Sequence, residues 1–468
     1  MVIDLAYQGG DDKEITMSAS CSKSDNLPID LGDGLVLRRS NVEDAVALAD
    51  FTARVHSDEG PDKPDERVWA WTHDLMAKPH PTFKASDFTV VEDVNKGQIV
   101  SAMNLIPQTW TYAGVPFTVG RPELVGTLPE YRNRGLVRRQ FDIIHQWSAQ
   151  HGDKLQAITG IPYYYRLFGY EMAMNLGGGR VGFPTHIPRL NEGESEPYNF
   201  RPAFEADIQF LSELYASGCQ RSLVACSRDD AAWLDELTGK SEKNVQRLEL
   251  RLIETNNGVK VGFLTHPSFS WGDMMPAVGY EIAHGFSWRE VTPSVIRYLE
   301  NIYIQYNPER GTKKPFGAFG FWLGEDHPVY HLMPDSLPRI RKPYAWYLRV
   351  ANVPEFLNLI TPVLEKRLAE SPMAGYTGEV KITFYQDGVC MVFEKGGITN
   401  VEAWKPTPIA NSGNAAFPPH TFLQLLFGYR SVEMLKASFA DCWTDRDETH
   451  VFLDTLFPRQ PSDVWPIS

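Results

Sequence analysis

The chain has 468 residues, of which 43% are hydrophobic and 22% are charged, as in an ordinary globular protein. No apolar run approaches the ~18 to 20 residues that span a bilayer, and at about 150 residues per domain the length predicts roughly three domains. The 45 Lys and Arg residues against 59 Asp and Glu residues give a net charge of −14. This charge repels nucleic acid and attracts cations, so we expect an amine rather than a nucleic acid as the partner.

The five cysteines stand far apart and form no Cys-x-x-Cys pair. Such spacing indicates neither a disulfide framework nor a zinc cluster, so we expect a cytoplasmic protein without a bound metal. Residues 1–34 are polar and acidic, whereas a secretion signal would begin with basic residues and continue with an apolar core. We therefore predict a flexible leader over residues 1–34.

The first patterned segment opens with a short strand at residues 34–39 and a helix at residues 41–51, where apolar residues recur at helical spacing. The same order, strand and then helix, returns at residues 198–202 and 205–211. Between the two copies, residues 183–197 are rich in Pro, Gly and acids, which is typical of a linker. The pattern predicts a repeated domain with a boundary in this linker.

A third pattern begins after residues 337–343 with an expected helix at residues 353–360. Residues 379–385 and 389–393 alternate as half-buried strands on either side of the turn Asp387-Gly388. The fold class that we predict is α+β. The predicted domains after the leader are 35–190, 198–343 and 344–468.

The densest positive charge follows an expected strand that begins at Glu123. From Arg132 to Arg139 there are four arginines and no acid, in a chain whose net charge is −14. The first N–H groups of the helix that starts here have no partner within the helix, and they can bind a pyrophosphate that Gly135 allows to approach closely. The segment predicts a site for an anionic cofactor; a solvated, arginine-rich helix start is the alternative.

Two motifs in this region resemble the GNAT superfamily of acetyl-CoA-dependent N-acetyltransferases. Residues 132–137, Arg-Asn-Arg-Gly-Leu-Val, resemble the family's cofactor loop Arg/Gln-x-x-Gly-x-Gly/Ala, with Val137 in place of the last small residue. Downstream, the segment from Tyr165 to Tyr170 resembles the family's Tyr-x-x-x-Gly-Phe/Tyr element. The bulky residue within Pro-x-x-Arg-x-Arg-Gly-Leu is similar to the Eis-like (enhanced intracellular survival) branch.

The resemblance implies that acetyl-CoA is the co-substrate and that its acetyl group passes to a primary amine by direct attack. It makes Tyr165 the donor of a proton to the departing sulfur, with Tyr163 and Tyr164 as competitors for that role. An aromatic core cluster is the alternative for these tyrosines. The cofactor-binding residues implied are Val125, Gly126, Thr127, Arg132, Asn133, Arg134, Gly135, Leu136, Val137, Arg138, Gly160 and Ile161.

The reaction also needs a base, because an ammonium with a pKa of ~10.4 costs about 4 to 5 kcal/mol to deprotonate at pH 7. Glu123 and water are two candidates, although the pattern favours an ordinary surface acid at a strand end for Glu123. Eis-like enzymes fold their C-terminus into the acetyltransferase cleft, so by resemblance the α-carboxylate of Ser468 is a further candidate, opposite Tyr165. The alternative is that Trp465 and Ile467 only hold the tail against the protein.

The sequence leaves the acceptor open among aminoglycosides, polyamines and protein lysine. A cluster of acids near Trp69 and Trp71 predicts an aromatic, negatively charged mouth, and a solvated acidic loop explains it equally well. The acids are Asp58, Glu59, Asp62, Asp65 and Glu66.

Eis-like proteins continue with a second GNAT-like domain that lacks a working cofactor loop, and then with a domain resembling sterol carrier proteins. Residues 198–343 and 344–468 fit this order, and the resemblance further implies a homo-oligomer, a hexamer. Two other functions stay open: a lipid or sterol carrier and a non-catalytic CoA-binding scaffold.

Overall fold

The computed structural model describes residues 27–306, 314–407 and 413–468. The expected flexible leader spans residues 1–34, of which residues 1–26 lie outside the described residues. For residues 29–32 the expectation was wrong, because they form a strand. Residues Ile29–Gly32 form strand β1, which pairs antiparallel with β2 (Leu35–Arg39). Asp33 and Gly34 both have positive φ angles, 54° and 76°, which suits the tight turn of a hairpin.

The first unit is built on a nine-stranded sheet, with the order β1-β2-β3-β4-β5-β6-β17-β7 and β10 paired with β4. Three of its strands, β1, β10 and β17, come from outside the expected first domain, residues 35–190. The remaining strands are β3 (Phe88–Asp93), β4 (Gln98–Tyr112), β5 (Val115–Thr127), β6 (Leu155–Ile158), β7 (Glu171–Leu176), β10 (Val224–Cys226) and β17 (Tyr344–Arg349).

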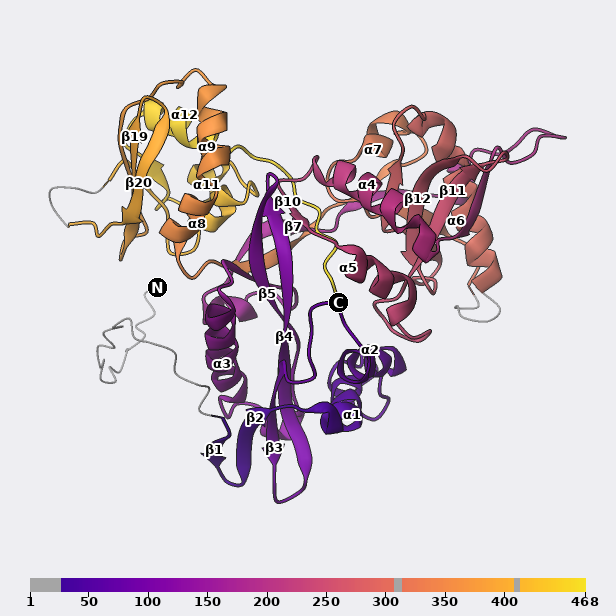
Figure 1. Cartoon of the computed structure of the whole chain (residues 1–468), viewed down its shortest axis with the longest axis horizontal. Coiled ribbons are helices and arrows are strands. Elements are labelled where there is room, and N and C mark those ends of the chain that lie inside the picture. Colours follow the sequence, from indigo (N-terminus) through magenta and orange to yellow (C-terminus); the bar gives the residue numbers. More distant parts are fainter. Residues whose placement is uncertain (1–26, 307–313, 408–412) are drawn as a thin grey trace, which may run out of the picture.

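Helices cover both faces of this sheet (Figure 1). Helices α1 (Ala45–Val55) and α2 (Glu66–Ala77) pack together on one face, and α3 (Leu136–His151) packs on the other. Each helix turns an apolar stripe inward, as residues of α3 such as Phe141 and Ile144 illustrate.

Strands β5 and β6 set the position of the site because they run parallel and then part. Their paired residues are Val119 with Leu155 and Gly120 with Gln156, near the start of β6. Beyond these pairs β5 continues to Thr127, where α3 follows after a short 3₁₀ turn, η2 (Pro129–Tyr131). The sheet therefore opens at the end where the sequence places the arginine-rich loop.

The second unit repeats the opening of the first. The interval from Arg38 to Asp44 recurs from Arg201 to Asp207, and both pairs form ion pairs, at 2.8 and 2.7 Å. Its two four-stranded sheets, β14-β12-β11-β9 and β13-β15-β8-β16, comprise β8 (Gly179–Gly182), β9 (Tyr198–Pro202), β11 (Leu248–Thr255), β12 (Lys260–Pro267), β13 (Met274–Ala277), β14 (Gly279–Ile282), β15 (Ala318–Phe321) and β16 (Arg339–Arg341). Its α-helices are α4 (Ile208–Cys219), α5 (Asp230–Leu234), α6 (Trp288–Tyr306) and α7 (Pro328–Leu332).

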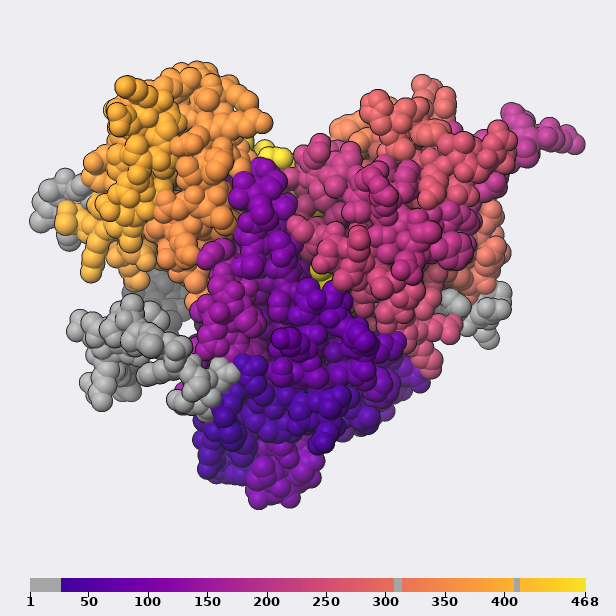
Figure 2. Space-filling view, in the orientation of Figure 1, coloured from indigo at the N-terminus to yellow at the C-terminus, as the bar shows by residue number. Residues whose placement is uncertain are grey.

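The third unit is a five-stranded sheet packed with helices, and the predicted α+β class is confirmed. Figure 2 shows the three units as lobes, with the first in contact with both others. The strands are β18 (Gly378–Thr383), β19 (Gly388–Glu394), β20 (Gly397–Ala403), β21 (Ala415–Ala416) and β22 (Trp443–Thr444), and the helices are α8 (Val353–Leu359), α9 (Thr361–Ala369), α10 (Phe422–Leu426), α11 (Val432–Ser438) and α12 (Asp447–Leu456).

Strand exchange fixes the three units to one another. Strand β8 joins a sheet of the second unit although it precedes the expected linker, and β17 inserts between β6 and β7 although it follows the expected boundary at residue 343. The tip of the β4–β5 hairpin rises between the other two lobes, where the Tyr112 hydroxyl donates to the carbonyl of Leu426 at 2.8 Å (Figure 1). None of the helices formed by the described residues has the length and apolar character that a bilayer crossing requires.

Candidate active site

A pocket of about 630 Å³ lies where β5 and β6 part, between the end of α1, the start of α3 and the 3₁₀ turn η3 (Tyr164–Phe168). It brings together most of the residues that the sequence analysis selected. These are Val125, Gly126, Thr127, Arg132, Asn133, Arg134, Gly135, Leu136, Val137, Arg138, Ile161 and Tyr165.

Gly135 lines the end of this pocket where α3 begins. It has φ 73° and ψ 10° and precedes α3, which begins without a side-chain cap and without an acid in its first turn. A Cβ built on Gly135 meets nothing within 4 Å, so open space lies against the backbone here. The uncapped N–H groups and the positive end of the helix dipole make this a fitting place for an anion.

The arginines of the loop have different surroundings. Arg132 donates from Nε to the carbonyl of Thr127 at 3.3 Å, which ties the loop to the end of β5. Arg134 pairs with the exposed Asp33 at 2.7 Å, and Arg138 lies 5.2 Å from the ring centre of Phe168. Their cationic groups surround the helix start, and in this chain of net charge −14 they supply the local positive potential.

A bulge in β5 forms the wall of the pocket next to α1. Opposite β4, Ala102 pairs with Gly126 and Asn104 with Glu123, so β5 carries one extra residue in between, and Leu124 adopts φ 52°. A Cβ on Gly126 would lie 2.6 Å from Val55, so glycine allows the last turn of α1 to approach the strand.

Tyr165 is the buried phenol of the pocket, with 7% of its surface exposed. Its ring meets those of Tyr164 and Tyr347 edge-on, with 5.4 Å between centroids in both pairs. Burial, with a smaller effect of the Glu123 charge, raises the pKa of Tyr165 well above its ordinary value, so the hydroxyl keeps its proton at neutral pH. Tyr164 also lines the pocket, whereas Tyr163 is 64% exposed.

Gly160 does not line the pocket, but it sets the position of Tyr165. Its φ is 146°, and a Cβ placed there would lie 2.8 Å from Cε2 of Tyr165. A side chain at residue 160 would therefore push the phenol out of place.

Glu123 lies on the bulged strand and is already engaged. One of its carboxylate oxygens accepts a hydrogen bond from Arg121 at 2.6 Å, and Arg121 is itself 5% exposed. Arg121 also donates to the carbonyl of Ile467 at 3.2 Å. The tail of the chain thus reaches Glu123 through one arginine.

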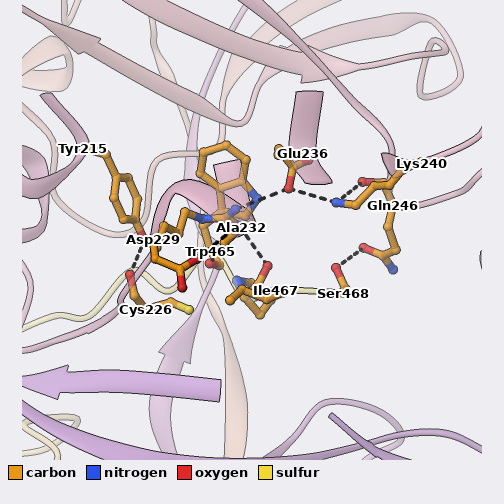
Figure 3. A network of polar contacts seen from close by, with 12 residues as sticks. Tyr215, Cys226, Asp229, Ala232, Glu236, Lys240, Gln246, Trp465, Ile467 and Ser468 are labelled. Atoms are coloured by element: carbon orange, nitrogen blue, oxygen red, sulfur yellow. Dashed lines mark hydrogen bonds and ion pairs between the residues drawn. The ribbon is translucent and has the colours of Figure 1, made fainter. Parts of the chain in front are cut away.

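The chain end runs from the third unit to a place between the first and second units (Figure 1), and Figure 3 shows Trp465, Ile467 and Ser468 among their polar contacts. Arg228 stacks on Trp465, with 3.9 Å from the guanidinium carbon to the ring centre, and donates to the carbonyl of Pro466 at 3.0 Å. Ser468 is 7% exposed, and its hydroxyl lies 3.5 Å from Gln246. Ser468 lines a small cavity that also contains Asp74, His80 and Lys240, so the structure does not bring it into the pocket of Tyr165.

The expected acidic, aromatic mouth is assembled only in part. Trp71 is 7% exposed and belongs to the core, while Trp69 donates from its indole to Asp50 at 2.8 Å. Of the five acids, three have structural partners: Glu59 pairs with Lys63, Asp65 caps α2, and Glu66 pairs with Lys243. Asp58 and Asp62 are exposed.

Sequence reasoning missed His56, which ends α1 and lines the same pocket as Tyr165. No motif marks it, and the available signal was its position between an amphipathic helix and the acidic stretch. Among the described residues no group of three or more His, Cys, Asp and Glu side chains could hold a metal ion.

The family model of the acetyltransferase (GNAT) domain matches residues 37–173, which contain all of the pocket's residues. No curated protein matches the sequence. Three solved structures share the fold over 92% of this chain: a probable N-acyltransferase of unknown function from Enterococcus faecalis (14% identity, TM-score 0.60, 97% of that chain), a GCN5-related N-acetyltransferase from Anabaena variabilis (14%, 0.60, 99%) and Eis1 from Mycobacterium abscessus (13%, 0.56, 99%). Residues 37–173 therefore match the GNAT acetyltransferase domain, and the chain shares its fold with these three proteins over nearly its whole length.

Proposed function

We propose that the protein is an N-acetyltransferase that moves the acetyl group of acetyl-CoA to a primary amine by direct attack. One observation carries the proposal: a single pocket contains the uncapped, acid-free start of α3 at Gly135 and the buried phenol of Tyr165. An anion site and a proton donor are the two things that a CoA thioester requires of its enzyme.

The residues present fit the cofactor. The N–H groups that follow Gly135, with Arg132, Arg134 and Arg138, would hold the pyrophosphate. Val125 to Thr127 on β5 and the segment Gly160-Ile161 after β6 would bond the pantetheine arm, since the two strands part there. When bound, acetyl-CoA supplies the activated acetyl group.

Tyr165 is the proposed acid. Its hydroxyl keeps its proton at neutral pH, because burial raises its pKa, and it can give that proton to a sulfur on which negative charge develops. Tyr164 is the competing residue, since it lines the same pocket.

The acceptor that we propose is a cationic amine: an aminoglycoside, a polyamine or a lysine side chain. Support comes from the net charge of −14 and from the exposed Asp58 and Asp62, which follow α1 close to the pocket-lining His56. A cationic acceptor is concentrated by such a field.

The test is release of free CoA thiol from acetyl-CoA in the presence of a panel of these amines. We expect turnover with at least one amine class and none without an amine. If the protein binds acetyl-CoA in calorimetry but none of the amines causes thiol release, a non-catalytic CoA-binding scaffold replaces this proposal. If it does not bind acetyl-CoA, both readings fail.

The remaining units extend the proposal. The second unit, with its Arg201–Asp207 pair, would be a non-catalytic copy of the first. The third unit would be the sterol-carrier-like domain, supported by the order of the units, and the assembly would be a homo-oligomer, as the resemblance implies.

A further inference from the structure

His56 follows the last residue of α1, where this helix meets the pocket. Its backbone N–H closes the last turn of α1 by donating to Thr52 at 3.0 Å. The close approach of Val55 to Gly126 holds this turn against the bulge of β5. The imidazole thereby lines the same pocket as Tyr165, from a different element.

One nitrogen of the imidazole, Nε2, is buried and has no hydrogen-bond partner among the described residues. The backbone of Leu124 lies close enough to favour the protonated ring, an effect smaller than that of burial. In a neutral imidazole with its proton on Nδ1, Nε2 has a lone pair, which is the form that accepts a proton.

Buried polar groups ordinarily have a partner, so an unpaired Nε2 in a pocket wall needs a reason. Asn104, the register partner of Glu123 across the bulge, is likewise fully buried with neither side-chain polar atom bonded among the described residues. Asn104 does not line the pocket, so of these two side chains only His56 is placed to meet a polar molecule that enters it.

We propose that His56 is the general base of the reaction and takes a proton from the acceptor amine through Nε2. The inference rests on the proposed acetyltransferase function and adds the base that Tyr165 needs as its counterpart. Glu123 is less suited, because Arg121 already occupies one of its oxygens at 2.6 Å. Ser468 is less suited, because it lines a different cavity.

The protons balance as follows. His56 Nε2 accepts one proton from the ammonium, and the freed lone pair forms the N–C bond with the acetyl carbon while the C–S bond breaks toward sulfur. Tyr165 Oη gives its proton to the sulfur and recovers the proton that leaves the amide nitrogen. His56 then returns its proton to solvent, so each transfer releases one proton overall.

The charge state of His56 suits this step. Burial lowers its pKa below the ordinary value, against smaller opposite effects of the Glu123 charge and the Leu124 backbone, so the ring is neutral at pH 7. The other titratable or charged groups that line the pocket are Tyr131, Tyr164, Tyr165, Arg132, Arg134 and Arg138. Burial raises the pKa of Tyr164 and of Tyr165, so both hydroxyls keep their protons at that pH.

The test is the pH profile of kcat/KM for wild type and His56→Asn. The Asn side chain is polar like the imidazole, but it offers no base in place of Nε2. Wild type should show a plateau between the low pKa of His56 and the ~10.4 of the amine, because neutral imidazole and ammonium coexist there. The variant should lose about 10²-fold or more at pH 7, and its rate should rise tenfold per pH unit, because it must wait for free amine.

His80→Asn is the matched control. His80 is also buried with an unpartnered Nε2 among the described residues and a pKa lowered to about 4, but it lines the cavity of Ser468. It should keep the plateau. If His56→Asn melts earlier, the shape of its residual profile still decides, because a structural loss lowers the whole curve without changing its slope.

A readout without cofactor is the NMR titration of the His56 ring, assigned by its disappearance in the variant. We expect a pKa below ~6.5. A plateau retained in His56→Asn, or an imidazolium at pH 7 in the titration, would overturn the inference and leave the acetyltransferase proposal standing. Absence of wild-type turnover with every amine overturns the acetyltransferase proposal itself.

Discussion

The first and second units begin alike and diverge at the helix that follows their central strands. Both open with a strand that contains an arginine, which pairs with an aspartate directly before the next α-helix, at 2.8 and 2.7 Å. Helix α3 of the first unit then starts at Gly135 with no acid in its first turn, whereas α6 of the second unit carries Glu290 there. The two units therefore share their opening, and they differ in the charge at the start of the later helix.

The contrast is electrostatic as well as steric. At α6 the backbone N–H groups of Glu290 and Val291 both donate to the carbonyl of Ser287 at 3.0 Å, and the Glu290 carboxylate complements the helix dipole. At α3 the corresponding charge is missing and open space lies beside Gly135. A duplicated fold can therefore keep its architecture while only one copy keeps the geometry of an anion site.

Removal of the Tyr165 hydroxyl is the change with the largest expected effect. Tyr165→Phe keeps the ring contacts with Tyr164 and Tyr347, so turnover should fall by roughly 10² to 10⁴ while acetyl-CoA affinity stays near normal. Thiol release and calorimetry measure the two quantities. If Tyr164→Phe shows this pattern in place of Tyr165→Phe, the donor is Tyr164.

A negative charge at Gly135 should make the start of α3 resemble that of α6. A carboxylate about 5 Å from a phosphate charge repels it by about 3 kcal/mol at an effective dielectric constant of about 20, so Gly135→Asp should weaken acetyl-CoA binding roughly 10²-fold. Calorimetry is the measurement. Gly135→Asn has the same shape and no charge, and its affinity should fall much less; equal losses in both variants would mean that strain at φ 73°, not charge, is responsible.

The sequence predicted the features that depend on residues close together in the chain. The strand and helix openings, the arginine loop and Tyr165 depend on short spacings, and residues of one pocket came from two such motifs. Strand exchange could not be predicted, because β17 pairs with strands nearly two hundred positions away and β8 joins a sheet of the following unit. Local alternation indicates a strand but not its neighbour.

Two further misses have specific causes. Trp69 and Trp71 were treated as one aromatic mouth, but residues two apart on a helix point in different directions, so Trp71 faces the core. His56 was missed because its place in the pocket depends on its packing beside the bulge at Leu124, which is more than sixty positions away in the chain. The hairpin of β1, by contrast, was visible in the turn Asp33-Gly34 and was overlooked.

Replacing the aspartate of the Arg–Asp pair at the start of either unit should have the smallest effect, and it tests how alike the two units are. Asp44 bonds Arg38 and the backbone of Asn41, while Asp207 bonds Arg201, Lys260 and the backbone of Phe204. The side chain of Asp207 is the more buried, at 3% exposure against 11%. Replacing either by Asn removes charge-assisted hydrogen bonds worth about 2 kcal/mol, and we expect the larger loss for Asp207→Asn in urea unfolding at pH 7.

The pH dependence separates charge from shape. Hydrogen bonds from Arg201 and Lys260 hold the pKa of Asp207 well below its usual range, and Arg38 and Asn41 lower that of Asp44 against the opposing effect of burial. A lowered folded-state pKa means that the stabilisation is complete above the unfolded value of ~3.9 and is lost as the pH falls through the folded value. The stability difference between wild type and each Asn variant should therefore shrink below about pH 4, and at lower pH for Asp207 than for Asp44. A difference that stays constant to pH 2 would assign the loss to packing, and the two openings would then be alike in shape only.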